Sequence, residues 1–285
     1  MFEKIKSLVK GDSVIVLENN SNTTLTFEEN KEVIILNNVS SDVTLDIEVK
    51  NNANVKLVEI CLFTDDSVLT KNIRCYENCK LEVISFELST NLNSKAFVKT
   101  YLDEGSYITN KKISLFANNS HYIEDVYLEG KNSNFTASNV YVNYNNGTQD
   151  VDYTVTHNNV DTVSELFNYG ICKNKSILNI NTNGVVLKDA VRSDLKQKTK
   201  GVLIDLESSI SANPLLKIDE YDCLASHGAG IGAIDEEDLY YLMSRGLTKA
   251  SSEKLIIGGF VNPIYEALPE GEIKEFVIKV VNKYL

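Results

Sequence analysis

Short runs of β-branched and other apolar residues recur along the first part of the chain, with Asn, Ser, Asp and Gly between them. The starts of the first four runs lie 11, 8 and 11 residues apart, which is the spacing of a strand followed by a tight turn. These runs are Ser13–Leu17, Thr24–Phe27, Glu32–Leu36 and Val43–Val49. The pattern predicts a mainly β structure in which each strand buries alternate side chains.

A weaker repeat continues beyond these runs. Its units end in apolar residues that lie 24, 27 and 27 positions apart: Ala53–Leu57, Glu77–Leu81, Gly105–Ile108 and Asn132–Phe135. This period is typical of a β-solenoid, in which each coil supplies hydrogen-bond partners to the next and Asn tolerates left-handed corners. A β-sandwich also gives strands at this spacing, but the repeat favours the solenoid.

The amino-acid composition and the predicted type of secondary structure change near residue 213. Residues 1–200 contain 29 of the 32 asparagines, whereas Pro214, Pro263 and Pro269 all come later. The last 70 residues predict helices, because Asp235 and Thr248 are suitable N-caps and Gly246 is a suitable C′ residue. A third helix is predicted by apolar residues at i, i+3, i+4 and i+7, namely Ile273, Phe276, Val277 and Val280.

Charge and composition exclude several classes of partner. The chain has 40 acidic and 28 basic residues, a formal charge of −12 and a pI near 4.8, which argues against binding to nucleic acid or to an anionic membrane. It has no apolar run of transmembrane length and no apolar core of a secretory signal near its start. Its five cysteines include no CxxC pair, so reduced thiols and a cytoplasmic location are expected.

Residues 213–248 resemble the SufB/SufD family of iron–sulfur cluster assembly proteins. The resemblance rests on a strand that begins at Pro214, a Ser-His-Gly-Ala segment around His227, and an Asp-Glu-Glu helix that ends in Tyr-Leu-Met-Ser-Arg-Gly. A Leu-Ile-Ile-Gly-Gly-Phe segment, Leu255–Phe260, follows at the family's spacing. The resemblance is strong over roughly residues 200–270, and Gly184–Ala190 also looks like the coil that precedes this region in the family.

The resemblance implies a right-handed parallel β-helix with a C-terminal helical subdomain, divided at 1–232 and 233–285. It also implies a subunit without enzymatic activity that pairs with a SufB-like chain and is driven by a SufC-type ABC ATPase. The ATPase is expected to dock on the helical subdomain, at the residues Leu239, Leu242, Met243 and Arg245.

Departures from the family pattern make the chain SufD-like. Ser208 stands where B-type members carry a scaffold cysteine, and Gly228 stands where they carry Glu after the histidine. Ala225 replaces a cysteine of many D-type members, and the chain is shorter than typical members. The isolated chain is therefore expected to hold no firmly bound cofactor, and an iron ion or iron–sulfur cluster would bind only transiently at a dimer interface.

His227 and Cys223 are the candidate metal ligands. A neutral imidazole and a thiolate both suit iron, and in a regular strand Cys223 would share a face with Ala225 and His227. The alternatives are a structural or surface histidine and a small buried thiol.

Three other motifs receive structural interpretations. Cys75 and Cys79 are interpreted as unrelated core thiols, because partner ligands for a closed metal site are absent nearby. Gly228–Gly232 lacks the Lys-Ser/Thr of a P-loop and is predicted to form a tight strand-to-helix passage. The acidic run Asp235–Asp238 is expected to match the dipole of a helix N-terminus.

Two alternative functions remain open at this point. One is a self-pairing scaffold of a minimal two-component system, in which a single short chain fills both the B and the D roles. The other is a β-helix carbohydrate-active enzyme, a polysaccharide lyase or hydrolase, which would need converging carboxylates that are not evident in the sequence.

Overall fold

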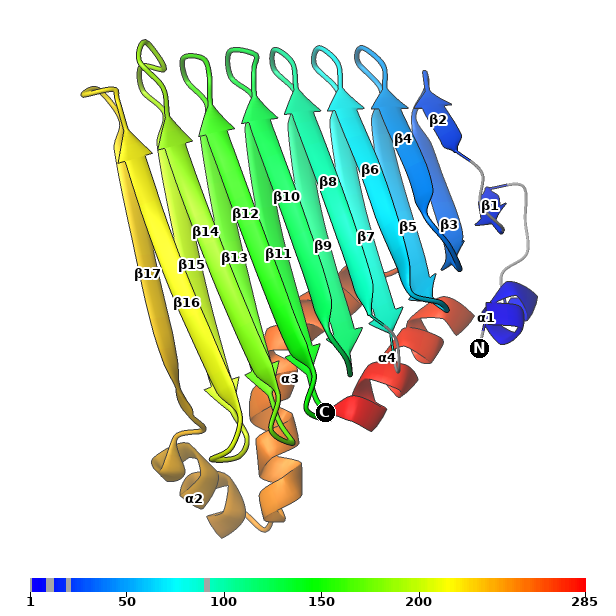
Figure 1. The fold of residues 1–285 in the computed structure, drawn as a ribbon, viewed down its shortest axis with the longest axis vertical. Coiled ribbons are helices and arrows are strands. Elements are labelled where there is room, and N and C mark those ends of the chain that lie inside the picture. The colour runs from blue at the N-terminus through cyan, green and yellow to red at the C-terminus, as the bar shows by residue number, and fades with distance from the viewer. Residues whose placement is uncertain (1, 9–12, 19–21, 90–92) are drawn as a thin grey trace.

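The computed structural model describes residues 2–8, 13–18, 22–89 and 93–285 and shows a β-solenoid (Figure 1). Successive strands alternate between two sheets, so odd-numbered strands form sheet A and even-numbered strands form sheet B. Every strand pair recorded among the described residues is parallel and joins one coil to the next. The predicted mainly β solenoid is therefore confirmed, and the sandwich alternative is wrong.

Sheet A consists of nine strands: β1 (Val14–Leu17), β3 (Lys31–Val39), β5 (Asn54–Phe63), β7 (Lys80–Ser89), β9 (Tyr107–Phe116), β11 (Asn134–Asn143), β13 (Val163–Cys172), β15 (Asp194–Leu203) and β17 (Leu224–Ala233). Sheet B consists of eight strands: β2 (Thr23–Phe27), β4 (Val43–Val49), β6 (Ser67–Cys75), β8 (Ser94–Leu102), β10 (Ser120–Leu128), β12 (Thr148–His157), β14 (Ile177–Val186) and β16 (Ser209–Ile218).

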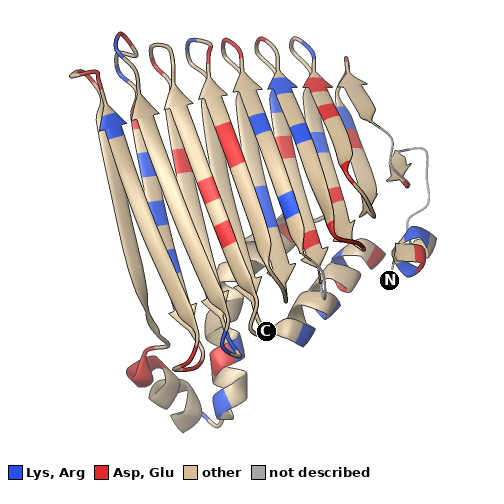
Figure 2. Ribbon diagram, in the orientation of Figure 1, with Lys and Arg blue, Asp and Glu red and all other residues tan. Residues whose placement is uncertain are grey.

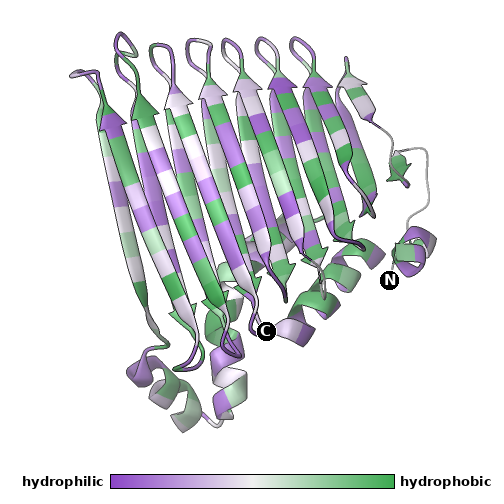
Figure 3. Ribbon diagram, viewed as in Figure 1, coloured by the Kyte–Doolittle hydropathy of each residue, from purple (hydrophilic) through white to green (hydrophobic). Residues whose placement is uncertain are grey.

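The core lies in the lumen between the two sheets. Alternate residues of each strand face the lumen, which gives the alternating bands of apolar and polar residues in Figure 3. The sequence repeat was correct from its second unit on, since Leu81, Ile108 and Phe135 stack in one column. The first unit of the repeat, Ala53–Leu57, was aligned wrongly by two residues. The sequence repeat equated Leu57 with Leu81, whereas Val55 pairs with Leu81 in the structure.

The turns between the sheets explain the abundance of Asn. In the part of the chain that the structure describes, ten residues other than glycine have positive φ, and six of them are the asparagines Asn52, Asn78, Asn132, Asn145, Asn146 and Asn174. Asn adopts this left-handed conformation at lower cost than most residues. Backbone hydrogen bonds also join successive turns: the N–H of Asn52 donates to Glu77 O, and the N–H of Asn78 donates to Glu104 O. The predicted role of Asn at the corners is confirmed.

The described helices are α1 (Phe2–Leu8), α2 (Glu236–Ser244), α3 (Lys249–Ala267) and α4 (Glu272–Tyr284). Asp235 and Thr248 cap α2 and α3 as predicted, although α3 continues past Phe260 and includes Pro263. The helices α3 and α4 cover the outer face of sheet A, where Phe260 stacks on Tyr169 and Tyr284 on Tyr144. None of the helices in the described segments has both the length and the apolar character needed to cross a membrane.

Candidate functional site

The solenoid is open at its C-terminal end. The strands β16 and β17 are the last strands of sheets B and A, and no further coil covers them among the described residues. All ten residues of β17 are exposed, and none of β16 is buried. The lumen of the last coil and one hydrogen-bonding edge of each sheet are therefore open to solvent.

His227 lies in the middle of this open end. It pairs with Gln197 of β15, whose side chain faces the lumen and is only 5% exposed. Because paired residues of parallel strands point to the same face of a sheet, the His227 imidazole points toward the open lumen. It makes no hydrogen bond or ion pair to any other described residue, so both ring nitrogens are free.

A groove of about 470 Å³ runs along β15 and β17 at this position. It is lined by His227, by Ser226 and Gly228, and by the lysines Lys196, Lys198 and Lys200 of β15. The strand β15 pairs with β17, and Figure 2 shows bands of basic residues on β15, whereas β17 carries no Lys, Arg, Asp or Glu. These lysines alternate with the buried Gln197 along β15, so they lie on the outer face of sheet A, opposite to the lumen toward which His227 points.

Cys223 lies one residue before β17 and is half-buried. Its Sγ donates to the Glu220 carbonyl at 3.2 Å, and it packs against a small apolar cluster that includes Leu195. Burial, with the nearby Glu220 and Asp222 carboxylates, raises the pKa of the thiol, which disfavours the thiolate that binds metals.

Cys223 and His227 do not form a chelating pair. Cys223 packs against the cluster that contains Leu195, and Leu195 pairs with Ala225, which is consistent with the predicted shared face of Cys223, Ala225 and His227. However, four residues of extended chain separate their Cα atoms by about 13 Å, too far for a thiol and an imidazole to meet on one ion. Within the described segments, no three His, Cys, Asp or Glu side chains gather as a metal site.

The predicted docking residues lie on α2, which extends beyond the ends of the strands and packs against α3 (Figure 1). No residue of α2 is buried. Leu239 and Leu242 are half-buried, whereas Met243 and Arg245 are exposed. The exposed apolar surface extends to Tyr240, Tyr241, Leu247 and Leu255.

The other motifs are placed as follows. Cys75 and Cys79 are buried core thiols as predicted, but they are not unrelated, because a side-chain hydrogen bond joins them. Asp235 caps α2 above an acidic first turn. The prediction of a tight passage at Gly228–Gly232 is wrong, because these residues lie inside β17 and none of the three glycines has a positive φ. Ser208 lies in the turn before β16, where its Oγ donates to Asp205.

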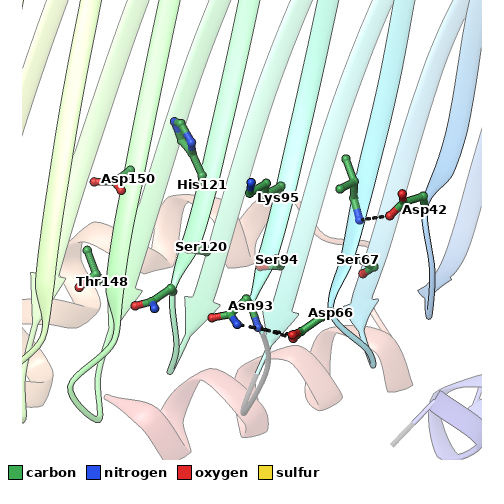
Figure 4. Close-up of a pocket in the computed structure, with 12 residues that line it drawn as sticks. Asp42, Asp66, Ser67, Asn93, Ser94, Lys95, Ser120, His121, Thr148 and Asp150 are labelled. Atoms are coloured by element: carbon green, nitrogen blue, oxygen red, sulfur yellow. Dashed lines mark hydrogen bonds between the residues drawn. The ribbon is translucent and has the colours of Figure 1, made fainter.

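Sequence reasoning missed a groove of about 800 Å³ at the start of the sheet B strands (Figure 4). Its carboxylates already link successive coils: Asp42 accepts from the Val68 N–H, Asp66 from the Asn93 N–H, and Asp150 from the Asn179 side chain. These bonds hold the turns in register. The groove therefore lends no support to the carbohydrate-active alternative, which requires free converging carboxylates.

Comparison with known proteins shows the family to which the chain belongs. The family model "SUF system FeS cluster assembly, SufBD core domain" matches residues 96–260, more than half of the chain. The chain belongs to the SufBD family. The match includes His227 and all of α2, so both candidate surfaces fall within the SufBD core region.

Curated relatives come from the same SufBD family. SufD of Bacillus subtilis is 32% identical over 118 residues, which is 41% of this chain and 27% of that protein. SufD of Escherichia coli is 27% identical over 158 residues, 55% of this chain and 37% of that protein. A SufBD family protein of Pyrococcus horikoshii is 34% identical over 119 residues, 39% and 25% of the two chains. The chain thus matches about a quarter to two fifths of the length of these relatives, and the predicted SufD-like resemblance is confirmed.

Proposed function

We propose that this SufD-like chain is a scaffold without enzymatic activity for iron–sulfur cluster assembly, and that it pairs through the open end of its solenoid. The observation that carries the proposal is the complete exposure of β17. An uncovered edge strand presents unpaired N–H and C=O groups to a second chain. In most solenoids terminal coils are capped, so an uncapped end supports pairing.

The proposed partner is a SufB-like chain, with a second copy of this chain as the alternative. Either partner would extend the sheets at β16 and β17 and bury His227. The cluster is cargo in this proposal, and His227 contributes one imidazole ligand to it. Cys223 is too distant to share an ion with His227, so the remaining ligands come from the partner.

A proline at the free edge tests the pairing. The Leu224 N–H donates to Ser193 O, and since N–H groups alternate in direction along a strand, the Ala229 N–H faces the open edge. Ala229→Pro should abolish the complex in size-exclusion chromatography with multi-angle scattering and leave the monomer folded, because edge positions tolerate proline. Mass measurement with and without the SufB-like chain separates the two partners, and an unchanged complex would contradict the proposal.

His227→Ala tests the ligand role. Anaerobic reconstitution of the complex should yield far less cluster per complex, whereas the melting temperature of the isolated chain should be nearly unchanged because the imidazole is exposed there. His121→Ala is the matched control, since His121 lies on sheet B and contacts Asp152 at 2.6 Å. Equal cluster yields for the two variants would remove His227 from the proposal.

The proposed docking site for a SufC-type ABC ATPase is the exposed apolar surface of α2 and the start of α3. Met243→Asp places a charge on this surface and should abolish capture of the cognate ATPase. Tyr221→Asp is the control, because Tyr221 is fully exposed in the turn between β16 and β17 at the other end of the strands. If both variants capture the ATPase equally, the docking assignment is wrong.

A further inference from the structure

Across the described segments, five charged side chains are buried within the lumen of the solenoid. Each is at most 6% exposed, and they come from five strands: Glu59 (β5), Lys71 (β6), Glu87 (β7), Lys112 (β9) and Glu124 (β10). Buried charges normally require a partner of opposite charge or several hydrogen bonds. The contacts of each charged side chain therefore indicate whether its hydrogen-bonding groups are satisfied within the protein.

Four of these charges have partners. Lys71 Nζ donates to Glu59 Oε2 at 2.5 Å, and Ser114 Oγ donates to Glu87 at 2.7 Å. Tyr122 Oη donates to Glu124 at 2.6 Å.

Lys112 is the exception. Its Nζ is buried and has no hydrogen-bond partner among the described residues, although it lies 3.0 Å from the centroid of the Tyr122 ring. The Tyr141 and Tyr153 rings are 5.5 and 5.7 Å away. Three aromatic rings attract a cation, but they do not replace the hydrogen bonds that the ammonium made in water.

A second group without a partner faces the same space. Asn110 lies two residues before Lys112 on β9, so both side chains point to the lumen, and Asn110 Oδ1 is also buried without a hydrogen bond. Both residues line a small void of about 20 Å³, here called the lumen chamber. Its other polar lining residues are Lys71, Ser85, Glu87, Thr100, Tyr122 and Glu124.

We propose that the lumen chamber binds one ordered water molecule, which accepts a hydrogen bond from Lys112 Nζ and donates one to Asn110 Oδ1. A cavity needs a volume of about 10–15 Å³ that is accessible to a water-sized sphere to hold one water molecule. The lumen chamber therefore has room for one. The chamber supplies an unmatched donor and an unmatched acceptor, and a buried water typically needs two to four polar partners. This water and the tyrosine rings keep Lys112 as an ammonium beside the buried carboxylates.

The electrostatics of the lumen agree with an ammonium at neutral pH. Burial lowers the pKa of Lys112 to about 8, and the carboxylates of Glu87, Glu124 and Glu59 limit the decrease, while Lys71 adds to it. The remaining ionisable groups around Lys112 are the hydroxyls of Tyr122, Tyr141 and Tyr153, whose pKa values are raised by burial. They stay neutral over the range in which Lys112 titrates.

Counting long-lived internal waters tests the bound water. Oxygen-17 relaxation dispersion of the whole protein should report one fewer such water in Asn110→Leu than in the wild type, because Leu fills the void and removes the acceptor. Thr109→Val, a change at the outward neighbour on the same strand, should leave the count unchanged. Equal counts in wild type and Asn110→Leu would overturn the proposal.

The pH dependence of unfolding tests the caged ammonium. Folded Lys112 binds fewer protons than unfolded Lys112 between pH 8 and 10.5, so the unfolding constant of the wild type, relative to Lys112→Met, should fall by up to tenfold per pH unit in this range. Lys111→Met is the control, because Lys111 faces outward and pairs with Glu82, and its profile should follow the wild type. Parallel profiles of wild type and Lys112→Met would contradict an enclosed ammonium. If Lys112→Met does not fold, the water count decides.

Discussion

The middle coils and the last coil of the solenoid follow the same backbone plan but differ in how far they are buried. In β11 the inward residues Phe135, Ala137 and Tyr141 are at most 1% exposed, whereas every residue of β17 is exposed. Both strands pair in register with an adjacent strand of sheet A, although β17 has only one such neighbour, β15. Hydrogen bonding to one neighbour is therefore enough to hold a strand in position. Burial requires a second neighbour. The last coil is thus folded by the chain itself but can be completed only by another molecule.

The largest expected effect comes from the lumen charges of the middle coils. Lys71→Ala leaves Glu59 buried beside a cavity without its counter-ion, and we expect a loss of about 3–5 kcal/mol in the free energy of unfolding by urea. The exposed pair Lys175–Glu207 is the control, and Lys175→Ala should cost only about 0–1 kcal/mol. Similar losses for the two variants would contradict the burial argument.

Apolar truncation sharpens the same contrast. Leu57→Ala removes a fully buried side chain of the lumen and should cost about 2–5 kcal/mol through lost burial and a residual cavity. Leu224→Ala in β17 removes a side chain that is 69% exposed, and we expect a change within about 0.5 kcal/mol. Denaturation of the isolated chain measures both. A large loss for Leu224→Ala would mean that the last coil is already covered in the monomer.

Acid should destabilise a middle coil through His157. Burial lowers its pKa from 6.5 to about 4, and its ring contacts Thr162 and Ser164. The unfolded state therefore binds the proton first, and about 3 kcal/mol of stability is lost as pH falls from 6.5 to 4.

Unfolding curves of the wild type and His157→Asn over this pH range isolate the contribution of His157. An equal slope in His157→Asn and the wild type would show that His157 does not carry the effect.

The smallest effect is expected at Gly228. A Cβ at this position meets no atom within 4 Å, so Gly228→Ala should raise the melting temperature slightly, by the equivalent of about 0.4–1 kcal/mol. At Gly130 a Cβ would lie 1.9 Å from Glu104 N, and Gly130→Ala should destabilise. A loss of stability in Gly228→Ala would show that the monomer packs something against β17.

The sequence predicted the strands and turns well because their signals are local. Alternating β-branched runs specify strands wherever they occur, and Asn at regular intervals marks corners such as Asn52 and Asn78. The register of the first repeat was wrong because Val55 and Leu57 are equally apolar, and only pairing with β7 distinguishes them. The glycines of β17 were misassigned because a strand without an outer neighbour needs no bulky residues.

The candidate site was less predictable. His227 and the α2 surface came from the family resemblance, and local patterns alone did not separate them from ordinary surface residues. The lumen charges were missed because a polar residue in an alternating strand is normally assigned to the outer face. A useful signal was present in the repeat itself. Lys112 of β9 occupies the same repeat position as the apolar Ile35 of β3, three strands earlier in sheet A, with Glu59 and Ser85 on the two strands between them.

The succession of parallel coils has a consequence for how the molecule opens. Each coil bonds only to its immediate neighbours, so local opening begins at a terminal coil and propagates inward one coil at a time. Amide hydrogens of β16 and β17 should exchange with solvent first, and protection should increase toward β11. Complex formation at the open end would then slow amide hydrogen exchange in coils that do not touch the partner, because it covers the coil from which opening starts.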